Sequence, residues 1–281
     1  MIPRRLSEEL REELGLRSEW ARQYAAIGWP ILPTHGIDLA GCCTCGNARC
    51  DRPGKHPARK NYKAMASLDP ATLESYWRLV LFNLSLHIPP GLLVLDVDNL
   101  AAMGPLARFG GFPVTPTHTT RRGFRMFYAW PRGEEAPSIG GLDRTKLDIL
   151  GTGNLCILPP STAAVPMSAG SGSSTYRPYR YSWQPGEDPW NCPVAELPAP
   201  FVEHLRRVAT VREKRRRAGV QGVTTHAGAL KLARRRSGYA GFASNGVARG
   251  AAGLTRTLQE AGARPEVIKA ALVEYHLGAG R

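Results

Sequence analysis

The clearest hydrophobic pattern in the chain is a short apolar run that ends in two acids. Residues 92–95 are all large and apolar, and Asp96 and Asp98 follow with Val97 between them. Such a run predicts a buried strand that reaches the surface at its acidic end. Because side chains alternate along a strand, Asp96 and Asp98 lie on one face while Val97 points back into the core. Two carboxylates so placed can bind divalent metal ions, and an acidic turn after a buried strand is the simpler alternative.

Further helix and strand patterns surround this strand. Ser7, followed by an imperfect apolar stripe, predicts a helix over residues 7–28, and Asp69 with Pro70 marks the start of a second one. A short helix is expected over residues 99–109. Apolar segments predict the other strands, at residues 29–32, 83–88, 124–130, 146–150, 155–158 and 179–183. Many strands with few helices between them are typical of an α+β fold.

The chain changes character after Pro198. Residues 163–175 are rich in Ala, Ser and Gly and are expected to form a flexible excursion within the first region. Beyond Pro198 the pattern is helical with Gly-containing breaks, and the last helix is expected to begin at Pro265. We therefore expect one domain over residues 1–200 and an all-helical appendage over residues 201–281.

Positive charge is concentrated in this appendage. The 281-residue chain has a net charge of +14, and residues 206–236 contain eleven Lys or Arg against one acid, Glu213. This density indicates binding to nucleic-acid phosphates, although solvated basic helices also occur in proteins that bind no polyanion. The residues expected to bind DNA are Arg206, Arg207, Arg212, Lys214, Arg215, Arg216, Arg217, Lys231, Arg234, Arg235 and Arg236.

Four of the six cysteines are crowded between Cys42 and Cys50, unlike the spread of a disulfide framework. Residues 41–57 contain almost no core-forming side chains, but they have the spacing C-x-C-x4-C-x5-H, which suits a tetrahedral Zn²⁺ ion. Cys42 is an adjacent competitor for one ligand position, and a loop of free thiols is the alternative. The expected zinc ligands of this knuckle are Cys43, Cys45, Cys50 and His56.

The chain gives no indication of a membrane partner. Its apolar runs are shorter than a membrane span, and charged residues in the first thirteen positions argue against a secretory signal. A cytoplasmic protein is expected.

The order of these motifs resembles the bifunctional DNA primase/polymerase (prim-pol) domain of the archaeo-eukaryotic primase superfamily, which is common on bacterial plasmids and phages. The resemblance covers about residues 18–195. The motifs that carry it are Gly28-Trp29-Pro30 with Pro33, the cysteine knuckle with Gly54-Lys55-His56-Pro57, Asp69-Pro70-Ala71-Thr72, Leu93-Val94-Leu95-Asp96-Val97-Asp98, the aromatic strand that Gly123 begins, Leu147-Asp148 and Pro159-Pro160-Ser161.

The resemblance implies an RRM-like catalytic module that joins nucleoside triphosphates to a 3′-hydroxyl on a single-stranded DNA template. By position, Asp96 and Asp98 match the family's paired ligands for Mg²⁺ or Mn²⁺, and Asp148 matches its third acid. A helicase acting in trans is a conceivable partner, because the chain lacks the phosphate-binding loop of a helicase. The residues expected to bind the nucleotide are Arg122, Arg125, Lys146 and Ser161, with Arg121 as a further basic neighbour.

Two departures from the family pattern bear on activity. Arg125 stands where the family has a His that contacts phosphates, and Ile88-Pro89-Pro90 replaces a Gly-containing turn. His118 is a conceivable substitute, although a His in a Thr-rich strand is more often structural. Two hypotheses follow, an active primase/polymerase in replication of a plasmid, phage or mobile element, and a DNA-binding replication protein with weak or no catalysis.

Two other enzyme classes use an Asp-x-Asp strand end. A haloacid-dehalogenase-like phosphatase needs Thr or Val at the position of Leu100 and a later acidic pair, which the sequence does not show. A metal-dependent glycosyltransferase has no obvious use for a zinc knuckle or a basic appendage.

Overall fold

The computed structural model describes residues 6–166, 176–223, 230, 251, 253–259 and 263–279. The chain divides into two compact units, Met1–Leu205 and Arg206–Arg281. The first unit contains helices and mostly antiparallel sheets, which confirms the α+β class expected from the sequence. The closer likeness to an RRM and the functional division of the chain stay predictions.

The helical elements of the described chain are α1 Glu8–Ala26, α2 Pro70–Tyr76, α3 Ala199–Val223, α6 Pro265–Ala279 and the 3₁₀ segments η1 Tyr62–Met65, η2 Leu100–Phe109 and η3 Leu142–Arg144. The strands are β1 Ile31–Thr34, β2 Asn83–His87, β3 Leu92–Val97, β4 Thr117–Thr119, β5 Phe124–Ala129, β6 Leu147–Leu150, β7 Leu155–Ile157, β8 Thr162–Pro166, β9 Tyr176–Arg180 and β10 Ala195–Glu196.

Both predicted helix starts have the expected caps. The Ser7 hydroxyl accepts a hydrogen bond from the Leu10 amide at 3.2 Å, and α1 follows. The Asp69 carboxylate accepts one from the Thr72 amide at 2.8 Å, and Pro70 occupies the first turn of α2. These caps satisfy backbone donors that a helix leaves unpaired, so the helices begin where the sequence predicts.

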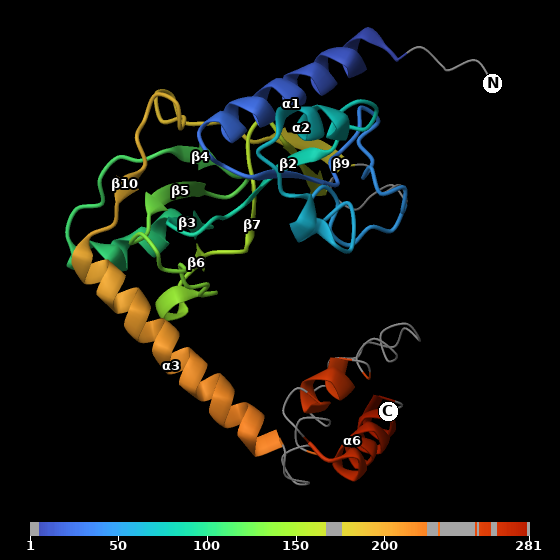
Figure 1. Cartoon of the computed structure of the whole chain (residues 1–281), viewed down its shortest axis with the longest axis vertical. Coiled ribbons are helices and arrows are strands. Elements are labelled where there is room, and N and C mark those ends of the chain that lie inside the picture. Colours follow the sequence, from blue (N-terminus) through green and yellow to red (C-terminus); the bar gives the residue numbers. More distant parts are fainter. Residues whose placement is uncertain are drawn as a thin grey trace. The chain divides into compact units, whose positions relative to one another are not determined.

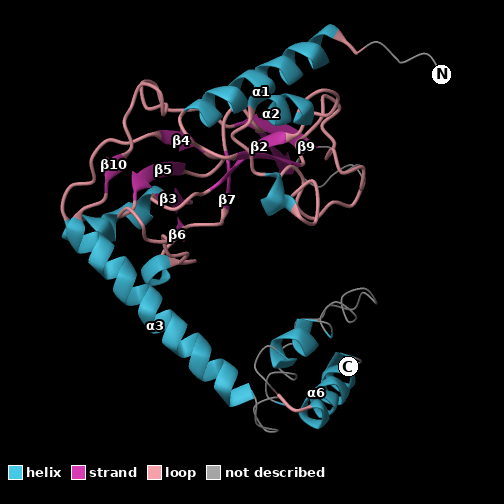
Figure 2. Ribbon diagram, in the orientation of Figure 1, coloured by secondary structure: helices cyan, strands magenta, loops and turns pink. Residues whose placement is uncertain are grey.

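The strands form three sheets within the described residues. One has the order β1-β2-β7, another the order β10-β5-β3-β6 with β4 beside β5, and β8 pairs with β9 alone. All of these pairs are antiparallel except β10 with β5. Figure 2 shows the strands gathered beneath α1 and α2, and β3 lies between β5 and β6.

One hydrophobic core joins α1 and α2 to both larger sheets (Figure 1). Trp29 stacks on Phe127 of β5 with ring centroids 5.0 Å apart. Burying a large apolar side chain stabilises a fold by about 1.5–3 kcal/mol, so this core fixes β3 and β5 firmly. Its members from the helices and sheets include Leu14, Ala21, Tyr24, Leu73, Trp77, Ile31, Leu84, Leu86, Leu92, Val94 and Phe127.

Some element boundaries differ from the expected ones. The first strand contains Pro33, which the sequence placed beyond the strand's end; β1 is an edge strand, where a residue without an amide donor is tolerated. Part of the expected flexible excursion is the ordered strand β8, and residues 167–175 lie outside the described chain. The strand expected over residues 179–183 is β9, which begins earlier.

The second unit has a small core of its own. Leu254 and Leu258 pack with Val267, Ala271 and Tyr275, the last three from α6, which begins at the predicted Pro265. In the described part of the chain, none of the helices combines the length and apolar character that a membrane span needs.

Candidate metal centre and acidic face

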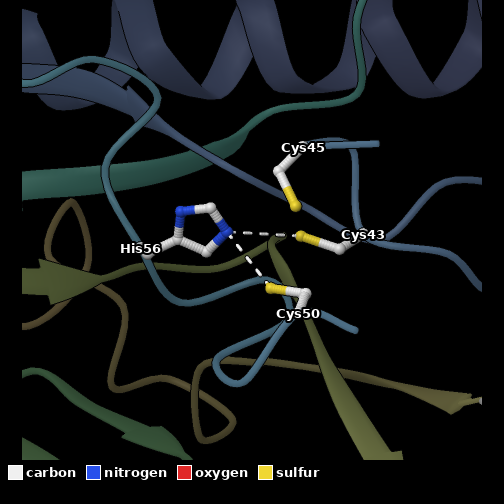
Figure 3. A group of neighbouring side chains, drawn as sticks. All are labelled: Cys43, Cys45, Cys50 and His56. Atoms are coloured by element: carbon white, nitrogen blue, oxygen red, sulfur yellow. Dashed lines mark hydrogen bonds between the residues drawn. The ribbon is translucent and has the colours of Figure 1, made fainter. Parts of the chain in front are cut away.

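Three cysteines and one histidine converge in the loop between β1 and α2. Cys43, Cys45, Cys50 and His56 have ligand atoms that all lie within 4.8 Å of one another. Figure 3 shows the three sulfur atoms and the imidazole pointing toward a common centre. Cys42 is exposed and lies outside this group, so the structure separates it from its neighbour Cys43.

The spacing of these atoms fits tetrahedral zinc. His56 Nε2 lies 3.5 Å from Cys43 Sγ and 3.4 Å from Cys50 Sγ. Zinc bonds of about 2.1 Å to nitrogen and 2.3 Å to sulfur, at the tetrahedral angle, place the two ligand atoms about 3.6 Å apart. Burial and the neighbouring thiols Cys45 and Cys43 raise the pKa of Cys50 to about 12, so a bound cation would be needed to hold Cys50 as a thiolate.

Backbone contacts hold the loop around this centre. Cys43 forms an isolated β-bridge with Ile37, and the His35 amide donates a hydrogen bond to the carbonyl of His56 at 2.9 Å. The His35 ring lies 4.5 Å from that of His56 and contacts the Thr44 hydroxyl at 3.0 Å through Nδ1. His35 therefore holds His56 in place, a role that the sequence alone did not indicate.

We expect the purified protein to contain one zinc ion per chain. Cys45→Ser and Cys50→Ser should lose it, because each removes one of four ligands, whereas the exposed Cys42→Ser should keep it. Elemental analysis of protein kept under reducing conditions measures this directly. A parent protein without zinc, or a Cys42→Ser variant that loses zinc as the ligand variants do, would contradict the assignment.

The three predicted acids lie at one end of the second sheet: Asp96 and Asp148 are in adjacent strands, and Asp98 directly follows β3. Asp96 of β3 is directly opposite Asp148 of β6 on one side and Arg125 of β5 on the other. Directly opposed residues of antiparallel strands share a face, and Asp98 lies two positions from Asp96. We call these three carboxylates the acidic face. Val97 is buried as predicted, but the core beneath α1 also includes Val94, which is on the same face of β3 as Asp96, so apolar side chains pack on both faces of the strand.

Arg125 occupies the centre of this region. Its Nη2 donates to Asp96 Oδ2 at 2.8 Å, its Nη1 donates to the carbonyl of Ile157 at 3.3 Å, and both charged side chains are largely buried. The buried Nε has no hydrogen-bond partner among the described residues. In this structure Arg125 therefore pairs with a carboxylate that was predicted to bind metal, while its predicted contact with phosphate stays a prediction.

The other two carboxylates are engaged elsewhere. Asp98 Oδ2 lies 3.2 Å from Arg122 Nη2, with both side chains solvent-exposed, and Asp148 Oδ1 accepts a hydrogen bond from the Gly141 amide at 2.6 Å. Gly123 allows the start of β5 to approach this edge, because a Cβ there would lie 1.8 Å from the Val97 carbonyl oxygen. The acidic face thus supplies carboxylate oxygens, which are suitable ligands for Mg²⁺ or Mn²⁺. These oxygen atoms do not gather around one point as the side chains of Cys43, Cys45, Cys50 and His56 do.

His118 has a structural environment. It is opposite Arg125 on β4, fully buried, and surrounded by the rings of Phe127, Tyr181 and Trp183 at 5.3–5.7 Å. Burial, aided by the charge of Arg125, lowers the pKa of His118 to about 3, so the ring stays neutral at physiological pH. A neutral, enclosed ring has a structural role beside Arg125 and is not placed to contact phosphates from solvent.

Lys55 interacts electrostatically with residues of the acidic face and its neighbours, which the sequence did not indicate. It follows Gly54 in the zinc loop, far from the acids in sequence, yet its charge interacts with Arg125, Arg121, Arg122 and Asp96. Partial burial, and then these three arginines, lower the pKa of Lys55. These interactions depend on the fold, because Lys55 is about forty residues from the nearest of these acids in the sequence.

Two other predicted nucleotide-binding residues have different positions. Lys146 is exposed and precedes Asp148 by two positions. Its backbone carbonyl accepts a hydrogen bond from the Asp98 amide at 3.0 Å. Ser161 is fully buried, and its hydroxyl accepts a hydrogen bond from the Leu84 amide at 2.8 Å. Because its side chain anchors β2, we leave Ser161 out of the proposed nucleotide-binding residues.

The predicted DNA-binding residues are only partly described. Arg207, Arg212 and Lys214 are exposed on α3, and Arg206 is half-buried. Arg215, Arg216 and Arg217 lie on the same helix, and Lys231, Arg234, Arg235 and Arg236 fall outside the described residues. Their role in binding DNA stays a prediction.

The fold brings together three cysteines and one histidine that could hold a metal ion, and it sets carboxylates beside arginines on one sheet. The chain matches the family model of the bifunctional DNA primase/polymerase N-terminal domain over residues 21–200, and it belongs to that family. No curated protein and no solved structure matches it. The family points to DNA primase/polymerase activity in replication, with a DNA template and nucleotide substrates.

Proposed function

We propose that this protein is an active DNA primase/polymerase, which transfers nucleotides to a 3′-hydroxyl on a single-stranded DNA template. The observation that carries the proposal is the row formed by Asp148, Asp96 and Arg125 across three adjacent strands. Carboxylates and a cation on one face match the two charge requirements of phosphoryl transfer, which are metal binding and phosphate neutralisation.

Each group has a definite chemical task in this proposal. Asp96, Asp98 and Asp148 would hold Mg²⁺ or Mn²⁺, which lowers the pKa of the attacking 3′-hydroxyl and neutralises the leaving pyrophosphate when bound. Arg125, with Arg122 and Lys146, would orient the triphosphate for in-line attack. A row of residues on paired strands keeps these positions rigid, as in-line transfer requires.

The second candidate function is DNA binding without turnover. It is favoured by one observation, the hydrogen bond between Arg125 and Asp96, since a carboxylate neutralised by arginine is a weaker metal ligand. The two functions share the fold, the zinc loop and the basic appendage, and they differ in whether nucleotide is incorporated.

The experiment that tests the proposal is primer synthesis and primer extension on a single-stranded template, with Mg²⁺ and with Mn²⁺. Product that depends on added metal supports the enzyme. Template binding without product under either metal supports the second function. The same assay with deoxynucleotides and ribonucleotides separately identifies the preferred substrate, and addition of a replicative helicase tests for a partner in trans.

We further propose that the basic segment of residues 206–236 binds template phosphates without reading their sequence. Replacing Arg215, Arg216 and Arg217 with Gln should make the slope of log affinity against log salt shallower by about 2, because each single-strand phosphate contact contributes about 0.7. Fluorescence anisotropy with labelled single-stranded DNA at several salt concentrations measures the slope.

The matched control for this substitution removes the same charge elsewhere. Arg11, Arg78 and Arg132 are exposed and lie outside the segment, so replacing them with Gln should leave the slope nearly unchanged. Equal slopes in both triple variants would show that the segment makes no special phosphate contacts.

A further inference from the structure

A cavity of about 830 Å³ lies at β1, the edge strand of the β1-β2-β7 sheet, and its other walls come from η1, α2 and the chain beside them. None of the described residues that line it is an acid or a member of the cysteine and histidine group. A cavity of this size can hold a nucleotide. Its walls include Pro33, Arg59, Met65, Tyr76 and Phe82.

One wall of the cavity, residues 58–66, is anchored to β1 at both ends. Pro57 forms an isolated β-bridge with Thr34, and Ser67 forms another with Ile31 through two backbone hydrogen bonds of 3.0 Å. Segments whose two ends are held close together in this way form compact loops. The sheet therefore fixes the position of this wall.

Aromatic rings form the opposite part of the cavity, and both are held in place. The Tyr76 hydroxyl donates a hydrogen bond to the Met65 carbonyl at 2.8 Å, which joins α2 to η1. The Phe82 carbonyl accepts a hydrogen bond from Nε1 of the buried Trp77 at 2.8 Å, and the Phe82 ring packs edge-on against His35 with centroids 5.6 Å apart. Rings fixed before a ligand arrives lose little freedom when they bind it.

Positive charge surrounds the cavity. Residues 49–63 contain six Lys or Arg and one acid, Asp51. Arg59, Lys60 and Lys63 are exposed, and within the described chain none of the three is in an ion pair. Unpaired cations around a cavity with aromatic walls match a ligand that alternates phosphates with planar rings, which is the chemistry of a nucleic-acid strand.

We propose that this cavity binds one nucleotide of single-stranded DNA, with its base against Tyr76 and Phe82 and its phosphate at Arg59. Lys60 and Lys63 attract the neighbouring phosphates. A base inside a duplex is stacked and paired, so only an unpaired strand can insert a base here. The inference rests on the proposed function, because it assigns a second contact to the template strand that the acidic face would copy.

Fluorescence anisotropy of the full chain with labelled oligothymidylate tests the phosphate contact. Arg59→Gln should weaken binding about tenfold and make the slope of log affinity against log salt shallower by about 0.7, because one charge-assisted contact is lost. Arg132→Gln is the control, since it removes an exposed arginine that does not line the cavity. Equal losses in the two variants would overturn the contact.

Substitutions of Tyr76 test the stacking. Tyr76→Leu should weaken binding about tenfold, whereas Tyr76→Phe should bind like the parent because it keeps the ring. Both variants lose the hydrogen bond to the Met65 carbonyl, so the Phe variant controls for that loss. A Tyr76→Leu variant that binds like Tyr76→Phe would show that no base stacks in the cavity.

Photo-cross-linking of the unsubstituted protein gives a test that does not depend on folding of a variant. Oligothymidylate with 5-iodouracil bases should cross-link within residues 57–82, at Tyr76 or Phe82, as mapped by mass spectrometry of the digested protein. Cross-links confined to other parts of the chain would overturn the proposal.

The outcomes separate this inference from the proposed function. In primer extension, Arg59→Gln should raise the template concentration needed for half-maximal rate and leave the maximal rate unchanged. If its template requirement equals that of the parent and incorporation is normal, the cavity is no template site and the proposed function stands. If the parent cross-links at the cavity but incorporates no nucleotide, the cavity assignment stands and the proposed enzyme is overturned.

Discussion

Asp148→Asn should reduce nucleotide incorporation by about a thousandfold or more while the protein stays folded. Metal ligation at the reacting phosphate is worth several kcal/mol of barrier, and each 1.4 kcal/mol is about tenfold in rate. The Asn side chain keeps an oxygen that can accept the hydrogen bond from the Gly141 amide, which Asp148 Oδ1 accepts at 2.6 Å in this structure. The fold therefore loses little when the negative charge is removed.

Asp96 needs a more careful substitution than the sequence suggested. Asp96→Ala leaves the largely buried Arg125 without its carboxylate, and an unpaired buried charge costs about 3 kcal/mol. Asp96→Asn keeps an acceptor for Arg125 and should lose incorporation as fully as Asp148→Asn. Thermal unfolding distinguishes the two kinds of variant, because only Asp96→Ala should melt at a markedly lower temperature.

Primer extension with Mg²⁺ and with Mn²⁺ measures these variants, with Glu135→Gln as the control for loss of one exposed acid. Substantial incorporation by both Asp96→Asn and Asp148→Asn would show that the acidic face is not the catalytic site. If Glu135→Gln also loses nucleotide incorporation, the cause is a general effect of charge on template binding.

The apolar run and its acids show what the sequence can predict. Residues 92–95 form the buried strand that their apolar character predicts, and the alternation of side chains along a strand is enough to assign Asp96 and Asp98 to one face. The grouping of Cys43, Cys45, Cys50 and His56 was equally predictable, because cysteines in a segment without core residues have few other uses. In both cases the signal lies within a few consecutive residues.

The positions of side chains that depend on pairing between distant strands were harder to predict. The register that sets Asp148 and Arg125 on either side of Asp96 joins three separate segments, and a shift of one residue would turn each side chain to the opposite face. The position of Lys55 depends in addition on Asn83 and Thr162, which hold Gly54 through buried hydrogen bonds. The assignment of Ser161 to nucleotide binding came from a motif. The fold buries this side chain, and its hydroxyl accepts a hydrogen bond from the Leu84 amide of β2.

Arg125 should compete with metal ions for the Asp96 carboxylate until a triphosphate is bound. The guanidinium is always charged and can only donate, so it pairs either with the Asp96 carboxylate, as here at 2.8 Å, or with phosphate oxygens. Binding of a triphosphate would draw Arg125 away and release Asp96 as a ligand for Mg²⁺ or Mn²⁺. Nucleotide and metal should therefore bind cooperatively, each strengthening the other.

Substitutions at Arg125 test this competition. Arg125→Ala should bind triphosphate about tenfold more weakly, because phosphate contacts are lost, yet bind Mn²⁺ more tightly without nucleotide, because Asp96 is freed. Arg125→His, which restores the family residue, should retain nucleotide binding and incorporate nucleotides at least as fast as the parent. Calorimetry gives the nucleotide affinity, and electron paramagnetic resonance of free Mn²⁺ gives the metal affinity.

The paired measurements make the test decisive, since a merely structural arginine would not move the two affinities in opposite directions. Arg122→Ala is the control: its pair with Asp98 is exposed, and an exposed pair contributes only about 0–1 kcal/mol, so its effect on Mn²⁺ affinity should be small. If Arg125→Ala binds triphosphate as tightly as the parent, Arg125 makes no phosphate contact, and its pair with Asp96 instead neutralises the metal site permanently. DNA binding without turnover would then be the better-supported function.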